Sequence, residues 1–230
     1  MVYRKFLNAR SPLRLLEKGL HGGLGPGNIG VVLGGHGVGK TSFLVGVALD
    51  ELLRSGHVLH VSLDKTVSHV RAYYDTIFED LAATTHLEDE ARVHREVDRL
   101  RSIHVYSDHV ISVAKLRDTV RIEVEAGSKP SVMIVEGLDF DQLGKADLAE
   151  IKSLAVELTA EVWLSTASEE ERVESIPSDV LRYDDDVSVV LALEPGNDVV
   201  ALRALKDHDN PDLSALHVSL DPRTLLLVRT

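Results

Sequence analysis

The stretch GGHGVGKTS, residues 34–42, determines how the rest of the chain is interpreted. Gly34 is followed, after four residues, by Gly39, Lys40 and Thr41, which is the spacing of a phosphate-binding loop. Glycines let such a loop curl until successive backbone N–H groups point at phosphate oxygens. Lys40 would bring a mobile charge to the β- and γ-phosphates, and the Thr41 hydroxyl would ligate Mg²⁺. We therefore expect a site for a nucleotide's phosphates and Mg²⁺. Its nucleotide-binding residues would be Gly34, Gly35, His36, Gly37, Val38, Gly39, Lys40, Thr41 and Ser42.

The flanks of this stretch match what a phosphate-binding loop requires. Residues 28–33 (NIGVVL) form an apolar, strand-like run, and apolar residues recur at helical spacing from Lys40 to about Arg54. His36 occupies a variable position of the pattern, and its side chain either lies beside a phosphate or is solvated. No Asn-Lys-x-Asp guanine signature occurs in the chain, which disfavours a GTPase.

Strand-like and helical segments alternate along the rest of the chain. Beyond about residue 187, short strands follow one another, joined by the turn-forming stretches EPGND and DHDNPD. This order predicts an α/β fold: a mostly parallel sheet flanked by helices, with an antiparallel C-terminal β-meander. We expect a single domain over 1–230, with a β/α body at about 25–170 and a β-rich tail at about 187–230. The body would have strands at 58–63, 103–107, 131–137 and 160–168, and helices at 67–82, 88–101, 110–126 and 145–159.

Composition narrows the functional classes. The net charge of −12 argues against a broad nucleic-acid surface, and the absence of cysteine excludes disulfides and thiolate metal sites. The most apolar long stretch, FLVGVALDELL, is interrupted by Asp50 and Glu51, and MVYRKFLNAR has no apolar core of signal-peptide length. We expect a cytoplasmic protein without membrane insertion. The 11 histidines form no tight cluster with carboxylates in the sequence, so no dedicated transition-metal site is expected.

Together with its flanks, the loop resembles the RecA-like P-loop ATPase domains of the KaiC and DnaB-helicase branch. LRLLEKGLHGGLGPGNIGVVLGGHGVGKTS resembles the opening of that branch, and VLHVSLD resembles its second strand. SVMIVEGLD resembles the strand with the Mg²⁺-associated aspartate, and VWLSTAS the strand that ends in a polar sensor. LRALKDHDNPD resembles the Lys-x-Arg stretch that acts on a neighbouring subunit's site. The resemblance covers about residues 12–230 and implies the family fold, often assembled as a hexameric ring.

Three positions depart from the family pattern. Asp64 stands where the family has the glutamate that orients or deprotonates the attacking water, and aspartate is one methylene shorter. Glu136 stands at the Mg²⁺-associated aspartate, so Thr41 and Glu136 are the implied metal residues; a carboxylate facing solvent is the alternative. Lys206 is kept, but His208 replaces the arginine finger. A neutral imidazole lacks the fixed charge and planar fork of arginine. The alternative for Lys206 and His208 is a solvated hairpin tip.

These departures favour binding over hydrolysis. The implied catalytic residues are Asp64, Lys206 and His208, and all three positions are weakened or rely on a neighbouring subunit. We therefore expect an ATP-binding protein with weak or absent hydrolysis, whose nucleotide controls self-association or the binding of a protein partner. A slow ring-forming ATPase is the alternative. A nucleic-acid motor is disfavoured because Asp139, Asp141 and nearby acids would repel phosphates.

Overall fold

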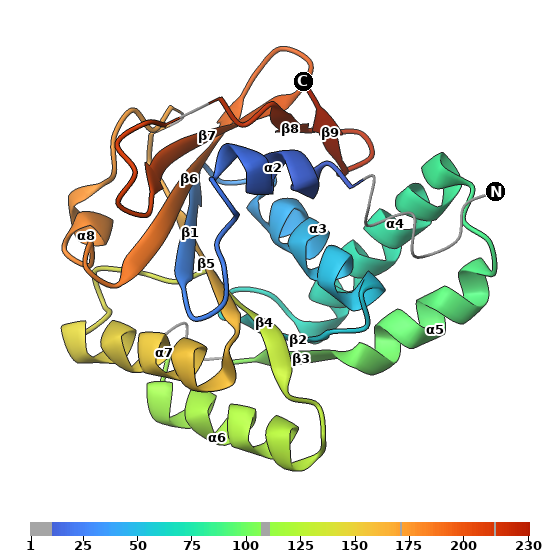
Figure 1. Cartoon of the computed structure of the whole chain (residues 1–230), viewed down its shortest axis with the longest axis horizontal. Coiled ribbons are helices and arrows are strands. Elements are labelled where there is room, and N and C mark those ends of the chain that lie inside the picture. Colours follow the sequence, from blue (N-terminus) through green and yellow to red (C-terminus); the bar gives the residue numbers. More distant parts are fainter. Residues whose placement is uncertain (1–10, 107–110, 171, 214) are drawn as a thin grey trace.

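The computed structural model of the chain describes residues 11–106, 111–170, 172–213 and 215–230. Residues 1–10, where the sequence has no signal-peptide core, and residues 107 and 110, at the ends of an expected strand and helix, lie outside this range. Nine strands form one sheet in the order β3-β2-β4-β5-β1-β6-β7-β8-β9 (Figure 1). The strands are β1 (Ile29–Gly34), β2 (His57–Ser62), β3 (Arg101–Val105), β4 (Pro130–Glu136), β5 (Glu161–Ala167), β6 (Val187–Pro195), β7 (Val200–Asp207), β8 (Val218–Leu220) and β9 (Leu227–Arg229).

The sheet is parallel from β3 to β6 and antiparallel from β6 to β9. The predicted α/β class, with a mostly parallel sheet and antiparallel C-terminal strands, is confirmed. One detail differs from the expectation. β6 was counted with the β-rich tail, yet it pairs parallel with β1, so the antiparallel part begins only at β7.

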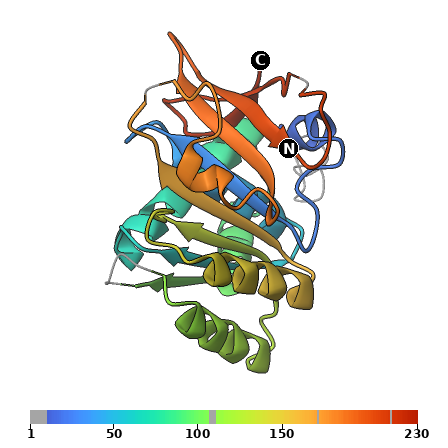
Figure 2. The ribbon, with the colours of Figure 1, turned by 90° about the vertical axis from the view of Figure 1, so that its left-hand side faces the viewer.

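Helices cover both faces of the sheet. One face packs against α2 (Leu13–Gly19), α3 (Lys40–Leu53), α4 (Val67–Thr85) and α5 (Glu90–Leu100). The other face packs against α6 (Val113–Glu125), α7 (Lys145–Leu158) and the short α8 (Ser178–Leu181). Figure 2 shows α6 and α7 stacked on this second face. Sequence periodicity did not predict α2 or α8, because seven and four residues are too short to show a helical repeat.

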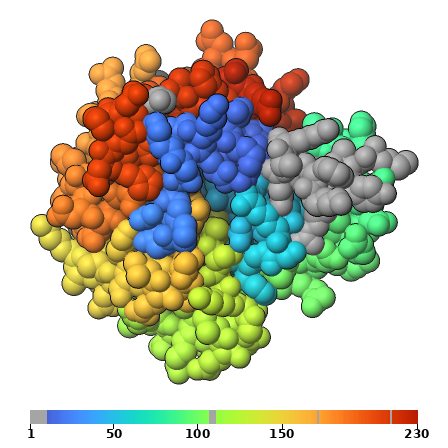
Figure 3. Space-filling model, in the orientation of Figure 1, coloured from blue at the N-terminus to red at the C-terminus, as the bar shows by residue number. Residues whose placement is uncertain are grey.

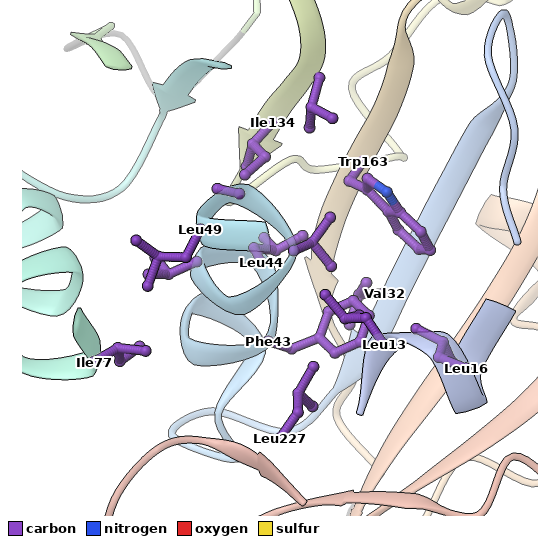
Figure 4. Packing of buried hydrophobic residues seen from close by; sticks show 14 of the residues in the cluster. Leu13, Leu16, Val32, Phe43, Leu44, Leu49, Ile77, Ile134, Trp163 and Leu227 are labelled. Carbon is purple, nitrogen blue, oxygen red and sulfur yellow. The ribbon is translucent and has the colours of Figure 1, made fainter. Parts of the chain in front are cut away.

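Buried aromatic side chains pack behind the glycine-rich stretch. Phe43 of α3 meets Trp163 of β5 edge-to-face, with ring centroids 5.6 Å apart (Figure 4). A Cβ atom at Gly30 would lie 2.7 Å from the same indole ring, so β1 needs a glycine there. Trp163 is 2% exposed, so it belongs to the core. The first turn of α3 is thus held firmly against the sheet.

The C-terminal strands reach back to cover this same region. α2 packs against β8, and in Figure 3 it lies across the face beside α3. The β8 side chain Leu220 is 1% exposed, and one of its methyl carbons would lie 2.3 Å from a Cβ at Gly39. The tail therefore packs directly on the glycine-rich stretch.

Strand register brings the sequence-predicted residues to one edge. Gly34 of β1 pairs with Ala167 of β5, and Ser62 of β2 pairs with Glu136 of β4. Each of these residues lies at the carboxyl end of its strand. Open parallel sheets bind ligands at this edge, in the crevice outside the strand ends. No helix in the described ranges is long and apolar enough to cross a membrane.

Candidate functional site

The glycine-rich loop (residues 34–42) joins β1 to α3 at this carboxyl edge. Gly37 and Gly39 have φ values of 74° and 109°, which side-chain-bearing residues rarely adopt. Gly39 is the N-cap of α3, and no side chain of the described chain caps that helix end. The N–H groups of a first helical turn have no partner within the helix, and the helix dipole is positive there. The geometry therefore suits an anion at the start of α3.

Lys40 points back over the loop. Its Nζ donates hydrogen bonds to the carbonyl oxygens of Gly34 at 2.7 Å and Gly35 at 2.8 Å. Burial, and next the nearby charge of Lys65, lower the pKa of Lys40 to about 8. Both of its hydrogen-bond partners are neutral, so an anion in front of the loop would offer this ammonium group a stronger partner.

The Thr41 hydroxyl contacts a buried carboxylate. It donates a hydrogen bond of 2.8 Å to Oε2 of Glu136, which is 0% exposed. Burial raises the pKa of Glu136, but His60, Lys65 and Thr41 outweigh it and lower the pKa to about 2. The alternative of a strand-end carboxylate facing solvent is therefore wrong. A charged carboxylate beside a hydroxyl is an oxygen ligand set of the kind that Mg²⁺ prefers.

A second layer behind Glu136 was not foreseen from the sequence. The His60 imidazole is fully buried, with Nε2 lying 3.2 Å from Glu136 Oε1, although the two atoms are not aligned as a hydrogen bond. His60 Nδ1 lies 3.1 Å from the Tyr74 hydroxyl, and the Arg101 guanidinium stacks 4.4 Å from the centroid of the Tyr74 ring. Tyr74 thus holds His60 in place beside Glu136. The only sequence signal was a histidine inside an apolar strand, which more often indicates a satisfied core residue.

Asp64 follows β2 and faces the same region. Its side chain is 47% exposed, and Oδ1 accepts a hydrogen bond of 3.2 Å from the Ser62 hydroxyl. The Lys65 ammonium group donates to Oδ1 and to Oδ2, both at 2.9 Å. Gly137 is required beside it, because a Cβ there would lie 2.8 Å from Asp64 Cγ. Asp64 thus lies in the same region as Thr41 and Lys40, but its carboxylate is already ion-paired with Lys65.

Lys40, Thr41 and Asp64 line one cavity of about 230 Å³, and Glu136 lies buried behind Thr41. Ser165 and Thr166 at the end of β5 also face it, as the predicted sensor strand would require. From the predicted nucleotide-binding set, the lining includes His36, Gly37, Gly39, Lys40, Thr41 and Ser42. Gly34, Gly35 and Val38 are not part of the lining; the first two contribute their carbonyls to Lys40 instead. His36 is exposed, in agreement with its solvated alternative.

Lys206 and His208 lie elsewhere in the same chain. β7 runs antiparallel to β6, and Lys206 pairs with Val190 near the amino end of β6. The Lys206 ammonium contacts Asp184 at 2.6 Å, and His208 Nε2 lies 3.1 Å from the carbonyl of Leu24. Both residues therefore sit at the opposite edge of the sheet from the cavity. They are packed against neighbours, so the alternative of a solvated hairpin tip does not describe them.

Two other features lie away from this edge. Asp75, His94 and Asp98 on α4 and α5 have ligand atoms within 4.8 Å of one another, a grouping that sequence spacing did not reveal. Arg101 already binds Asp98, at 2.5 Å, which weakens the case for a cation there. A larger cavity of about 490 Å³, between α3, α4 and β9, is lined mostly by apolar side chains. The chemistry-bearing groups converge on the smaller cavity.

Comparisons with known proteins add no assignment. No protein-family model matches the chain, and no curated protein matches it. The function must therefore be argued from the cavity at the carboxyl edge.

Proposed function

We propose that this protein is a RecA-like P-loop protein, similar to the KaiC and DnaB-helicase branch, that holds ATP with Mg²⁺ and hydrolyses it slowly or not at all. One observation carries the proposal: the glycine-rich loop, Lys40 and Thr41 line one cavity at the carboxyl edge of the sheet, and the Thr41 hydroxyl contacts the buried Glu136 directly behind it. The order of elements along the chain supports the proposal, since a buried strand precedes the loop and a helix follows the loop.

The residues present fit such a ligand. The uncapped start of α3 and the glycine-rich loop would surround the β- and γ-phosphates, and Lys40 would turn from its two carbonyl partners toward them. Thr41 would ligate Mg²⁺ directly, and Glu136 would bind the metal or a water on it. Bound Mg²⁺ would neutralise phosphate charge. Glu136 is ionised without any metal, because its neighbours hold its pKa near 2.

Weak hydrolysis follows from the state of Asp64. Both of its carboxylate oxygens already accept hydrogen bonds from Lys65, so an attacking water would have to compete with this ion pair for them. Among the described residues that line the cavity there is no arginine to balance charge on a transferring phosphate. An arginine finger contributes about 10³–10⁵ in rate. The cavity is therefore better equipped to hold a triphosphate than to cleave it.

Binding is the decisive test. Mg-ATP binding to the purified protein would be measured by calorimetry, with Lys40→Ala as the loop variant and Lys152→Ala as the control. Lys152 is a half-buried lysine of α7 whose ammonium group contacts Asn28, remote from the loop. We expect wild-type and Lys152→Ala to bind Mg-ATP and Lys40→Ala to lose most of its affinity. Equal binding by Lys40→Ala, or no binding by the wild-type protein, would end the proposal.

The nucleotide is proposed to act on assembly or on a protein partner in the cytoplasm. Light scattering after gel filtration, with and without Mg-ATP, would detect a change in self-association. Wild-type and Lys40→Ala would be compared at the same protein concentration. A change of mass in the wild-type protein alone is expected if nucleotide controls assembly, and an unchanged mass would direct attention to a different protein partner.

A slow ring ATPase remains the second candidate, favoured by the position of Lys206 and His208. Because both lie at the opposite edge from the cavity of their own chain, they could act only on the site of a neighbouring copy. Phosphate release per subunit would then rise with protein concentration and fall in Lys206→Ala. A nucleic-acid motor is disfavoured, because Asp139 and Asp141 are exposed just beyond β4 and would repel phosphates.

A further inference from the structure

A second lysine faces the same cavity as Lys40. Lys65 follows β2, where its backbone N–H donates a hydrogen bond of 3.1 Å to the Ser62 hydroxyl, and the Ser62 side chain is fully buried. This contact fixes the direction in which the Lys65 side chain leaves the strand. Its side chain is 17% exposed and lines the cavity together with Lys40 and Thr41.

The Lys65 ammonium group is the counter-ion of both carboxylates at the cavity. It contacts Asp64 Oδ2 at 2.9 Å and Glu136 Oε2 at 3.3 Å. The same Glu136 oxygen accepts the Thr41 hydroxyl at 2.8 Å. The lysine therefore occupies the side of Glu136 that faces the glycine-rich loop. Burial lowers the pKa of Lys65, but the charges of Glu136 and Asp64 outweigh it and raise the pKa, so the group is a cation at neutral pH.

The charge of the cavity changes when a ligand enters. Lys40 and Lys65 balance Asp64 in the cavity lining and Glu136 buried next to it, so the four groups together are near neutral. A Mg²⁺ ion near Thr41 would satisfy Glu136 and would leave one donor of Lys65 without its carboxylate. An ammonium group has three donors, and a phosphate oxygen is a strong acceptor for the one released. Lys65 can thus keep its hydrogen bonds to Asp64 while it donates a hydrogen bond to a phosphate oxygen.

Within the lining of the cavity, the side chains with a fixed positive charge are Lys40 and Lys65, as far as the described chain extends. Lys40 leaves the first turn of α3, next to the loop, whereas Lys65 approaches from the end of β2. Burial lowers the pKa of Lys40, and repulsion between the two lysines lowers it further. A polyanion between them would relieve that repulsion.

We propose that Lys65 binds the terminal phosphate of the nucleotide, so that the cavity distinguishes a nucleoside triphosphate from a diphosphate with a cation of its own chain. This inference rests on the function proposed above and adds a residue that the phosphate-binding pattern does not contain. Lys65 is then the specificity-determining residue for the third phosphate. It also holds Asp64 neutralised while it does so.

The test compares the affinity for ATP and for ADP, both with Mg²⁺, in four proteins. They are wild type, Lys65→Met, Lys65→Arg and the control Lys152→Met. Lys65→Met is expected to lower the affinity for ATP about ten- to hundredfold, as for a lost charged hydrogen bond, and to change the affinity for ADP by less than about threefold. Lys65→Arg should restore most of the preference for ATP, and Lys152→Met should match wild type. Thermal melting confirms that each variant is folded.

A second substitution tests the charge of Lys65 directly. Asp64→Asn removes the carboxylate that now holds Lys65, so the preference for ATP over ADP should rise. In the double variant Asp64→Asn/Lys65→Met that rise should vanish. The inference is overturned if Lys65→Met weakens ATP and ADP equally, or if the gain from Asp64→Asn survives without Lys65. If Lys40→Ala also binds as wild type does, the proposed function itself has failed, which is a different result.

Discussion

Replacing Gly39 by alanine probes the join between the glycine-rich loop and the C-terminal strands. Gly39 has φ 109°, and its added Cβ would lie 2.3 Å from a methyl carbon of Leu220. Leu220 is 1% exposed, so its methyl group cannot move into solvent. The strained backbone costs about 1–3 kcal/mol, and overpacking a core position costs about 1–3 kcal/mol more. We expect Gly39→Ala to lower the free energy of unfolding by about 2–6 kcal/mol.

Two neighbouring glycines separate these causes. Gly37 has φ 74° but open space around a new Cβ, so Gly37→Ala should lose only about 1–3 kcal/mol from strain. Gly35 shows neither feature, so Gly35→Ala should stay within about 0.5 kcal/mol of wild type. Urea unfolding, followed through the fluorescence of the single tryptophan Trp163, gives the values. A Gly39→Ala protein as stable as Gly35→Ala would refute the reasoning, as would a double variant with Leu220→Ala that shows simple additivity.

Three further outcomes are expected. Affinity for ATP should fall about tenfold from about pH 7 to about pH 9, because the Lys40 side chain, with its pKa near 8, is charged below that pH and loses its proton above it. Titrations of Lys40→Arg with ATP should show weaker binding that does not depend on pH in this range. Without metal, wild-type stability should fall as the pH drops from about 4.5 toward about 2, because the pKa of Glu136 is depressed in the folded state. Urea unfolding of Glu136→Gln should show a flatter dependence of stability on pH. The nucleotide complex of this variant should also bind Mn²⁺ about tenfold more weakly, as measured by electron paramagnetic resonance. Tyr74→Phe leaves His60 Nδ1 without its hydroxyl partner and should cost about 1–3 kcal/mol in the same unfolding assay; no loss would mean that this contact contributes nothing.

The sequence predicted the strands and helices of the β/α body well, because each of them carries its own local pattern of apolar residues. The strand expected at 28–33 is Ile29–Gly34, and the helix expected from Lys40 to about Arg54 is Lys40–Leu53. Local patterns failed where an element is short or where its partner is distant. The parallel pairing of β6 with β1 depends on strand order in the sheet, which the alternation of apolar residues along one strand does not contain.

The residues of the candidate site also fall into those that the sequence could predict and those that it could not. The loop residues follow from a compact pattern, and Asp64 and Glu136 followed from the family resemblance. Lys65 and His60 could not be assigned, since their importance lies in contacts with Glu136, more than seventy residues further along the chain. Such contacts become visible only after β2 and β4 are placed side by side.

The packing of Leu220 on Gly39 also bears on how the chain matures. Synthesis proceeds from the amino end, so the glycine-rich loop leaves the ribosome long before β8 does. Thr41 and Glu136 are separated by 95 positions, and the methyl group that covers Gly39 comes from Leu220 of β8. A nascent chain therefore has the loop sequence without the finished loop. Any ligand that needs the finished loop can stabilise only the completed protein, and its concentration during release would then influence how much of the newly made chain survives.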